Sequence, residues 1–211
     1  MLSNMPLSQN DSLERHNIPL EKLVYSAISK DASDARLISS ADITIRNELA
    51  RYCIEPHKCP NYGLAPSCPP HVSGPAGFRE LITNHPQAIA VKIDVSTKVL
   101  MSDERRDFYQ RLHEVVAGVE HEAIEMGYTE SKAFAGGSCK TIFCYGHEKC
   151  NQLFGTGKCL YPQTARPSMS GFGVDVAALM KTCGWSTAFV THEIGGDKNK
   201  MSWIAGLVLI G

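Results

Sequence analysis

Apolar and polar residues alternate along this chain in two different rhythms, which predict both helices and strands. Residues 102–126 place apolar side chains on one stripe at helical spacing, with Ser102 positioned as an N-cap and Gly127 as a C-terminal stop. Residues 88–95 instead alternate and are rich in β-branched side chains, a pattern typical of a strand. The long helix must bury its apolar stripe, and a sheet containing the neighbouring strand would supply the surface.

Weaker patterns complete the predicted fold. Helices are predicted at residues 19–29, 78–86 and 174–182, and strands at residues 132–135, 185–192 and 202–210. The last two strands are joined by a segment rich in Gly, Asp and Asn, which favours a hairpin turn. Residues 36–51 carry signals of both helix and strand. The fold class expected from this order is α/β (α+β), with helices packed on one mixed sheet of about four strands.

The length of the chain and its prolines indicate one domain with an unstructured start. A chain of 211 residues can bury a core without crosslinks. Residues 1–17 are polar and predict a flexible tail, which leaves residues 18–211 as a single domain. Two cysteine-rich loops, at about residues 53–77 and 136–170, are dense in Pro and Gly. We therefore expect these loops outside the regular elements, at an edge or an end of the sheet.

Charge and hydropathy exclude several classes of partner. The formal net charge is −1, so no overall field favours nucleic acid or an anionic membrane. The longest apolar run, residues 203–210, is far shorter than the roughly 18 residues that cross a bilayer. Residues 1–17 lack the basic start and apolar core of a signal peptide. We expect a soluble, cytoplasmic protein, and the sequence leaves its oligomeric state open.

The cysteines carry the candidate chemistry, because most of the eight lie in the two loops. The loop cysteines are Cys53, Cys59 and Cys68 in the first loop and Cys139, Cys144, Cys150 and Cys159 in the second. The gaps within the first triplet recur within the last three thiols of the second loop. In each triplet a Lys precedes the middle Cys and a Pro follows the last Cys. We interpret the loops as two half-sites that bind the same kind of group.

Clustered thiols in a chain without an export signal favour metal binding over disulfides or inert thiols. Soft thiolate ligands select iron–sulfur clusters or zinc. Structural zinc sites usually present their thiols as close pairs, whereas these wide gaps suit a cubane cluster, which is larger than one ion. We predict one or two [4Fe–4S] clusters bound by the seven loop thiols, with zinc as the alternative. Four lysines adjoin these thiols, either to favour thiolate formation or as a solvated rim: Lys58, Lys140, Lys149 and Lys158.

The first loop has only three thiols, so the identity of its fourth ligand is open. The candidates are His57, His71, water, and a thiol that crosses from the second loop. The eighth cysteine, Cys183, is expected on the apolar face of the helix at 174–182, where a free thiol acts as a small hydrophobe.

Other titratable residues carry weaker signals. The long helix contains His113, Glu114, His121 and Glu122, which lack the HExxH zinc spacing and predict a solvated helix face. The pair His192–Glu193 ends a predicted strand and is interpreted as part of a loop edge. The sequence contains no phosphate-binding loop, dinucleotide fingerprint or nucleophile elbow, and catalytic residues are unknown.

Three segments around the thiols resemble the DUF2284 family of predicted metal-binding proteins. They are CPNYGLAPSCPP from Cys59, AGGSCK from Ala135 and GFGVDVAAL from Gly171, within a resemblance that covers roughly residues 45–211. The resemblance implies a metal-binding or iron–sulfur protein of a kind found mainly in anaerobes, with the seven loop cysteines at the thiol positions of the family. It implies no particular reaction.

Three functions follow as hypotheses. The leading one is a protein with two [4Fe–4S] clusters that transfers electrons or acts as a redox accessory, with a redox protein as its partner. The second is an enzyme or ligand-binding protein whose three-thiolate cluster exposes an open iron. The third is a structural module that binds zinc. Because no sequence feature identifies a substrate, whether the chain is an enzyme stays open.

Overall fold

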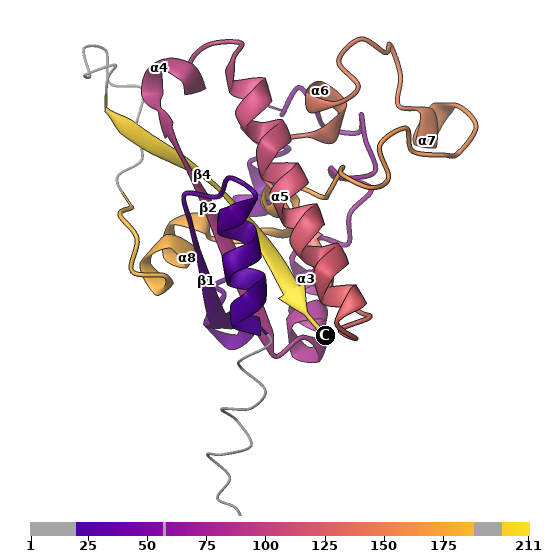
Figure 1. The fold of residues 1–211 in the computed structure, drawn as a ribbon. Coiled ribbons are helices and arrows are strands. Elements are labelled where there is room, and N and C mark those ends of the chain that lie inside the picture. Colours follow the sequence, from indigo (N-terminus) through magenta and orange to yellow (C-terminus); the bar gives the residue numbers. More distant parts are fainter. Residues whose placement is uncertain (1–19, 57, 188–199) are drawn as a thin grey trace, which may run out of the picture.

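The computed structural model describes residues 20–56, 58–187 and 200–211, and an antiparallel sheet lies at its centre (Figure 1). The sheet has four strands in the order β1 (Asp34–Ser39), β2 (Gln87–Ser96), β4 (Met201–Ile210) and β3 (Lys132–Phe134). The predicted α/β class with about four strands is confirmed. The sheet is not mixed, however, because β4 lies between β2 and β3 and pairs antiparallel with both.

The two central strands are buried on both faces. The β2–β4 ladder runs without interruption from the pair Gln87 and Ile210 to the pair Ser96 and Met201. All residues of β4 after Met201 are buried, which matches its continuous run of apolar residues. The outer strands are shorter, and the N–H of Ala133 on β3 donates a hydrogen bond to the carboxylate of Glu120 at 2.6 Å. A side chain therefore occupies this edge position, where a further strand would otherwise pair.

Alternate residues of β2 face two different helical layers. Ile89, Val91 and Ile93 pack with the helix at residues 20–29 and with α5 (Arg105–Glu125). Ala88 and Ala90 pack on the opposite face, in a cluster that includes α3 (Gly74–Asn84) and α8 (Val176–Thr182). Figure 1 shows α5 and the N-terminal helix in front of the sheet and α8 behind it. The period of two along β2 thus assigns each side chain to one of two cores.

The long helix α5 confirms the predicted apolar stripe but begins later than predicted. Leu112, Val115, Val116 and Val119 are fully or almost fully buried. The helix starts at Arg105 and not at Ser102, whose hydroxyl accepts a hydrogen bond from the Glu104 N–H at 3.2 Å in the turn before the helix. Turns with i to i+3 hydrogen bonds occupy residues 102–107. The chain therefore enters the α-helix through a segment of the tighter 3₁₀ type.

The remaining elements are short, and several lie near the thiols. They are η1 (Ser40–Asp42), α2 (Asn47–Arg51), α4 (Thr97–Leu100), α6 (Cys139–Ile142), α7 (Asn151–Phe154) and η2 (Met169–Phe172). The ambiguous stretch at 36–51 resolves into the end of β1, η1 and α2. The predicted helices at 19–29, 78–86 and 174–182 and the strands at 88–95, 132–135 and 202–210 are present with shifted bounds.

Two expectations are wrong, and others concern residues outside those that the structure describes. The expected strand at 185–192 is absent over residues 185–187, and its remainder, with His192, Glu193 and the expected hairpin turn, lies outside the described residues. The expected tail at residues 1–17 also lies outside them. The thiol loops are not wholly irregular, because α6 and α7 lie within the second loop and the proline-stiffened start of α3 lies within the first.

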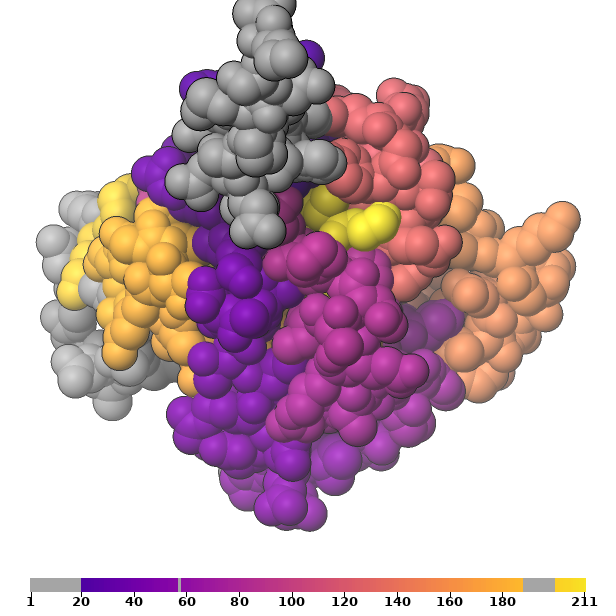
Figure 2. Space-filling view, turned by 90° about the horizontal axis from the view of Figure 1, so that it is seen from below, coloured from indigo at the N-terminus to yellow at the C-terminus, as the bar shows by residue number. Residues whose placement is uncertain are grey.

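Both thiol loops lie beside the β3 edge of the sheet. After β3 the chain leaves at Ala135 and returns at Ser168, which forms an isolated parallel bridge with Ala135. The N–H of Ser168 donates to the carbonyl of Ser67 at 3.2 Å, which ties the first loop to the same place. In Figure 2 the light orange segment that carries α7 projects on the side opposite the amber segment that carries α8. No helix among the described residues has the length and hydropathy needed to cross a membrane.

Candidate metal centre

The three thiols of the first loop line one cavity. Cys53, Cys59 and Cys68 line a space of about 140 Å³, whose other walls include the turn between β3 and α6 and part of η2. Cys68 is buried, whereas Cys53 and Cys59 are partly exposed. The structure therefore brings together three residues that span positions 53 to 68, as the sequence predicted for one half-site.

Backbone turns hold the first loop in this shape. The N–H of Cys59 donates to the carbonyl of Cys53 at 3.1 Å, and the N–H of Tyr62 donates to the carbonyl of Cys59 at 2.9 Å. The N–H of Gly63 donates to Pro69 at 2.8 Å and closes the loop. Gly63 has a φ of +78°, a left-handed conformation that a residue with a side chain rarely adopts. The prolines and this glycine thus help to fix the part of the loop before α3, which contains no helix or strand.

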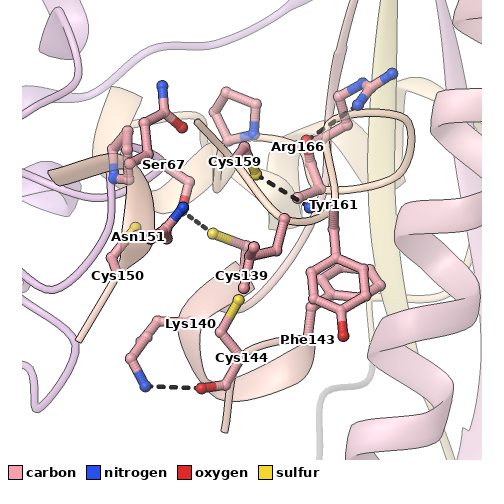
Figure 3. A pocket seen from close by; sticks show the side chains of 15 residues that line it. Ser67, Cys139, Lys140, Phe143, Cys144, Cys150, Asn151, Cys159, Tyr161 and Arg166 are labelled. Atoms are coloured by element: carbon pink, nitrogen blue, oxygen red, sulfur yellow. Dashed lines mark hydrogen bonds between the residues drawn. The ribbon is translucent and has the colours of Figure 1, made fainter. Parts of the chain in front are cut away.

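The four thiols of the second loop line another cavity, of about 170 Å³ (Figure 3). Cys139 opens α6, Cys144 follows that helix, Cys150 precedes α7, and Cys159 follows the glycine-rich turn after α7. Phe143 and Tyr161 supply an aromatic wall, with ring centroids 5.2 Å apart. The backbone N–H of Tyr161 donates to the sulfur of Cys159 at 3.4 Å.

Two polar side chains close the turns of the second loop. Lys140 is buried, and its Nζ donates to the carbonyl oxygens of Cys144 at 2.8 Å and His147 at 2.6 Å. Asn151 donates from Nδ2 to the carbonyl of Lys158 at 2.8 Å, which closes the segment between Cys150 and Cys159. These bonds satisfy backbone carbonyls that no helix or strand would satisfy. Both donors lie on the short helices of the loop, Lys140 on α6 and Asn151 on α7, so these helices help to hold the thiol-bearing turns in place.

Helix α5 holds both ends of the second loop through a buried histidine. His113 is fully buried; its Nε2 lies 3.1 Å from the carbonyl of Gly136, and its Nδ1 accepts the N–H of Arg166 at 3.0 Å. These partners require a neutral ring with the proton on Nε2. Burial is the main cause that lowers the pKa of His113 from 6.5 to about 4, with a smaller contribution from the nearby charge of Arg166. A neutral imidazole therefore links the exit and the return of the loop.

Arg166 strengthens the return of the loop. Its guanidinium pairs with Glu120 on α5, with Nε donating to Oε2 at 2.6 Å, and both side chains are nearly buried. The same guanidinium donates to the carbonyl oxygens of Pro162, Gln163 and Ala165. A buried ion pair stabilises a fold only when its remaining N–H donors also form hydrogen bonds. The guanidinium of Arg166 meets this condition.

The two cavities meet at a reciprocal pair of Ser–Cys dipeptides. The hydroxyl of Ser67 lies 3.1 Å from the sulfur of Cys139 in the other loop. Conversely, Cys68 donates from its sulfur to the hydroxyl of Ser138 at 3.3 Å. Ser67 also lies 3.8 Å from the sulfur of Cys68. We call these four residues the serine–cysteine junction. It places one thiol of each set against the other set.

Burial and neighbouring thiols raise the pKa of loop cysteines such as Cys53 and Cys139. Burial raises the pKa of Cys53, and the neighbouring Cys59 and Cys68 raise it further. Burial raises the pKa of Cys139 to about 11; the hydrogen bond from Ser67 lowers it, and Cys68 of the other loop is among the groups that raise it. The unliganded thiols of Cys53 and Cys139 are therefore protonated at neutral pH, and a metal must displace their protons when it binds.

The other predicted residues lie outside these cavities or outside the described chain. His71 is exposed and its Nε2 lies 3.4 Å from the carbonyl of Gly63, while His57 is not among the described residues. Cys183 is buried in the core cluster on the α8 side of the sheet, as predicted. Lys149 and Lys158 are exposed. All eight cysteines lie in the described part of the chain and are free thiols, so the disulfide alternative is not realised.

The thiols surround spaces and do not converge on a point. Among the described residues, no three Cys, His, Asp or Glu side chains approach closely enough to hold a single metal ion. A cavity needs only about 10–15 Å³ to hold one water molecule. The two thiol cavities, of about 140 and 170 Å³, therefore have room for a group several times larger than one small ion. The ligand roles of the seven thiols stay predictions, and their grouping around two cavities is the geometry on which those predictions depend.

Sequence reasoning missed the residues that position the thiols. His113 was expected on a solvated face, but it is covered because α5 lies between the sheet and the second loop. Its position one residue after the apolar Leu112 and three before Val116 was a usable signal of burial. The repeated Ser–Cys dipeptides, Ser67–Cys68 and Ser138–Cys139, were visible in the sequence but had no assigned role.

A comparison with protein families supports the metal-binding interpretation. Residues 36–210 match the family described as "Predicted metal-binding protein (DUF2284)", which covers most of the chain. Neither the curated proteins nor the solved structures that were compared contain a match to the chain. The matched span includes both thiol loops and the strands and helices that hold them. The chain therefore belongs to the DUF2284 family of predicted metal-binding proteins.

Proposed function

We propose that this protein binds two [4Fe–4S] clusters, one in each thiol cavity, and transfers electrons to or from a redox partner protein. The observation that carries the proposal is the grouping of all seven loop thiols around two adjoining cavities. Thiolates are the usual protein ligands of iron–sulfur clusters. Four thiols around one cavity supply a complete ligand set, and three around the other leave one position to be filled.

The arrangement of the thiols favours clusters over single zinc ions. A structural zinc ion needs four ligands at about 2.0–2.3 Å from one point. The described side chains include no set of three that meets such a requirement. A cubane presents its metal atoms at separated corners, so its ligands stand around a volume, as the thiols do around cavities of about 140 and 170 Å³.

The protein residues around the cavities have roles suited to holding such a group. The N–H of Tyr161, which donates to the sulfur of Cys159, supports a cluster-type ligand, since N–H to sulfur bonds influence the reduction potential. Phe143 and Tyr161 give the second cavity an aromatic wall. Burial raises the pKa of the Cys144 thiol, and the neighbouring Cys159 and Cys150 raise it further; Lys140 opposes this increase with a smaller effect. When bound, a cluster would supply one-electron oxidation and reduction.

The serine–cysteine junction supports transfer between the two sites. Ser67 and Ser138 connect Cys68 of the first cavity with Cys139 of the second through hydrogen bonds of 3.1 and 3.3 Å. Two one-electron centres that adjoin in this way can exchange electrons within the protein. Cys144, Cys150 and Cys159 are only partly buried and lie next to α6 and α7 along the chain, which would leave the second site accessible to a partner.

The test is the metal and sulfide content of protein purified without exposure to air. The expected result is a brown protein that contains iron and acid-labile sulfide and that gives an EPR signal after reduction with dithionite. Cys59→Ser and Cys150→Ser should each remove about half of the iron, because each variant disables one cluster site. Cys183→Ser is the matched control and should keep the iron of the wild type, because Cys183 lies in the core away from both cavities.

A different result would contradict the proposal. A colourless protein that contains zinc alone, with Cys59→Ser and Cys150→Ser losing zinc, would identify the zinc module instead. Loss of all iron in Cys59→Ser with retained secondary structure by circular dichroism would mean that the seven thiols serve one site, and not two.

A second candidate function rests on the three-thiol cavity. A cluster held by Cys53, Cys59 and Cys68 alone keeps one iron without a thiolate, and such an iron can bind a small ligand or act as a Lewis acid. His71 does not line this cavity among the described residues, which favours an open position. Small thiols or cyanide would then change the spectrum of one cluster, and no spectral change would contradict this candidate.

A further inference from the structure

A larger cavity lies next to the three-thiol site and has no role in the proposed electron transfer. It has a volume of about 740 Å³ and lies among α4, the first turn of α5 and α6. This volume is within the range of about 300–1,000 Å³ that small-molecule sites occupy. Figure 1 shows α4, the start of α5 and α6 along the same end of the molecule. We call it the arginine cavity, after Arg105 and Arg106 in its wall.

The charged groups of the cavity favour an anion. Arg105 and Arg106 line it, and Asp103 is the opposing carboxylate. Among the described residues Arg105 forms no ion pair. Arg106 lies over the ring of Tyr145 at 4.0 Å and has Asp107 at 3.7 Å, which is a long, exposed ion pair. A guanidinium presents a fork of N–H donors that matches carboxylate or phosphate oxygens, so Arg105 is available for such a group.

The apolar part of the lining indicates an organic ligand. Leu100, Met101, Tyr109 and Ile142 line the cavity between the arginines and the sheet. An inorganic anion would leave these surfaces in contact with water, whereas a carbon skeleton would cover them. The chemical class that fits both parts is a small organic acid with an apolar body.

The arginine cavity shares a wall with the three-thiol cavity. Asn61, Gly137 and Ser138 line both. Gly137 is essential to this thin wall: it has a φ of +78°, and a Cβ there would lie 3.1 Å from Cδ1 of Ile142. Ser138 accepts a hydrogen bond from Cys68 on one side and lines the arginine cavity on the other. A ligand in the arginine cavity would therefore lie directly beside the first thiol site.

We infer that the arginine cavity is a binding site for a small organic anion, whose acid group Arg105 and Arg106 hold beside the three-thiol site. The binding itself does not depend on the proposed clusters. One consequence of this binding does rest on the proposed function. A bound anion would change the electrostatic surroundings of a cluster in the three-thiol cavity and would leave those of the other cluster nearly unchanged.

The experiment titrates the full-length protein, as purified without air, with benzoate by isothermal titration calorimetry. Benzoate combines a carboxylate with an apolar ring, and benzamide is its uncharged counterpart. We expect saturable binding of benzoate and at least about tenfold weaker binding of benzamide, because a charged hydrogen-bonding partner is lost. Arg105→Gln should weaken benzoate binding about tenfold or more, and Arg106→Gln less, because Arg106 already stacks on Tyr145.

Arg111→Gln is the matched control, since Arg111 lies on the same helix but pairs with Asp31 and does not line the cavity. It should bind benzoate like the wild type. Unchanged affinity in the Arg105→Gln, Arg106→Gln double variant would overturn the inference, as would equal affinity for benzoate and benzamide.

Two further readings distinguish this inference from the proposed function. If the protein contains no iron but binds benzoate through Arg105, the inference stands and the proposed clusters fail. If the protein contains both clusters and benzoate does not bind, the inference fails and the clusters stand. Inorganic phosphate that binds as tightly as benzoate would overturn the assignment to an organic anion.

Discussion

The neutral, buried His113 makes the stability of this fold depend on pH in a way that one substitution can isolate. In the folded protein the pKa of His113 is lowered from 6.5 to about 4, mainly by burial. The unfolded chain therefore binds more protons than the folded one between about pH 6.5 and pH 4. The stabilisation is fully present above pH 6.5 and is lost as the pH falls toward 4.

The magnitude follows from the difference between the two pKa values. From 6.5 to about 4 is a difference of about 2.5, and each pKa unit corresponds to about 1.36 kcal/mol. His113 should therefore contribute about 3 kcal/mol to the free energy of unfolding above pH 6.5, an amount that disappears as the pH falls to 4. This is a large fraction of the total stability of an ordinary domain, about 5–15 kcal/mol.

The variant that tests this reasoning is His113→Gln. It cannot titrate, and it leaves the N–H of Arg166 without the acceptor that the ring nitrogen provides. At pH 7.5 it should be less stable than the wild type by about 1–3 kcal/mol, the cost of an unsatisfied buried donor. Between pH 6.5 and 4 its stability should fall by about 3 kcal/mol less than that of the wild type, so the two curves should approach each other.

The assay is urea unfolding at several pH values, followed by circular dichroism. Because the thiols and any bound metal add a pH dependence of their own, wild type and variant are compared at equal metal content at each pH. Leu112→Ala is the control: it removes a neighbouring buried side chain without a titrating group and should keep the pH dependence of the wild type. The reasoning is refuted if His113→Gln loses stability toward pH 4 as steeply as the wild type.

Four further substitutions test how the loops are built. Ser67→Ala should raise the pKa of Cys139, because the Ser67 hydrogen bond lowers it; iodoacetamide should label Cys139 about fivefold more slowly in metal-free protein, and an unchanged rate would contradict the junction. Gly137→Ala and Gly157→Ala both place alanine at a φ of +78°, but only the former creates a close contact. Each should lose about 1–2 kcal/mol in urea unfolding, with a larger loss for Gly137→Ala; equal losses would argue against that contact. Lys140→Met removes two hydrogen bonds to loop carbonyls and should destabilise the protein by about 2–4 kcal/mol in the same assay, whereas a neutral result would mean that the turns hold without it.

Local patterns were sufficient for the elements whose environment is uniform. The strand β2 and the helix α5 carry periods of two and of 3.6, and each period states which face is buried once a core exists. The equal gaps in the two cysteine triplets predicted two half-sites, and the structure groups those thiols around two cavities. Proline and glycine predicted loops in both places, because they restrict or release the backbone locally.

The same local patterns failed where a distant segment decides the environment. His113 is polar, so its sequence neighbours favoured a solvated face, but the second loop crosses α5 at this point and covers it. The sheet is antiparallel and not mixed because β4, the last strand in the chain, lies between β2 and β3 and runs antiparallel to both. Ser102 had the chemistry of an N-cap, but turns with i to i+3 hydrogen bonds occupy residues 102–107 and the helix begins only at Arg105.

By itself, the sequence determined which thiols group together, where the backbone must turn and which sides of β2 and α5 face a core, because these depend on residues close together in the chain. Only the tertiary structure decided that Ser67 and Ser138 join the two thiol sets, that His113 and Arg166 close the second loop, and that two arginines lie beside the first site. These contacts join residues as far as 72 positions apart, such as Ser67 and Cys139. Packing of the whole chain brings such residues together, and no local pattern of residues encodes that.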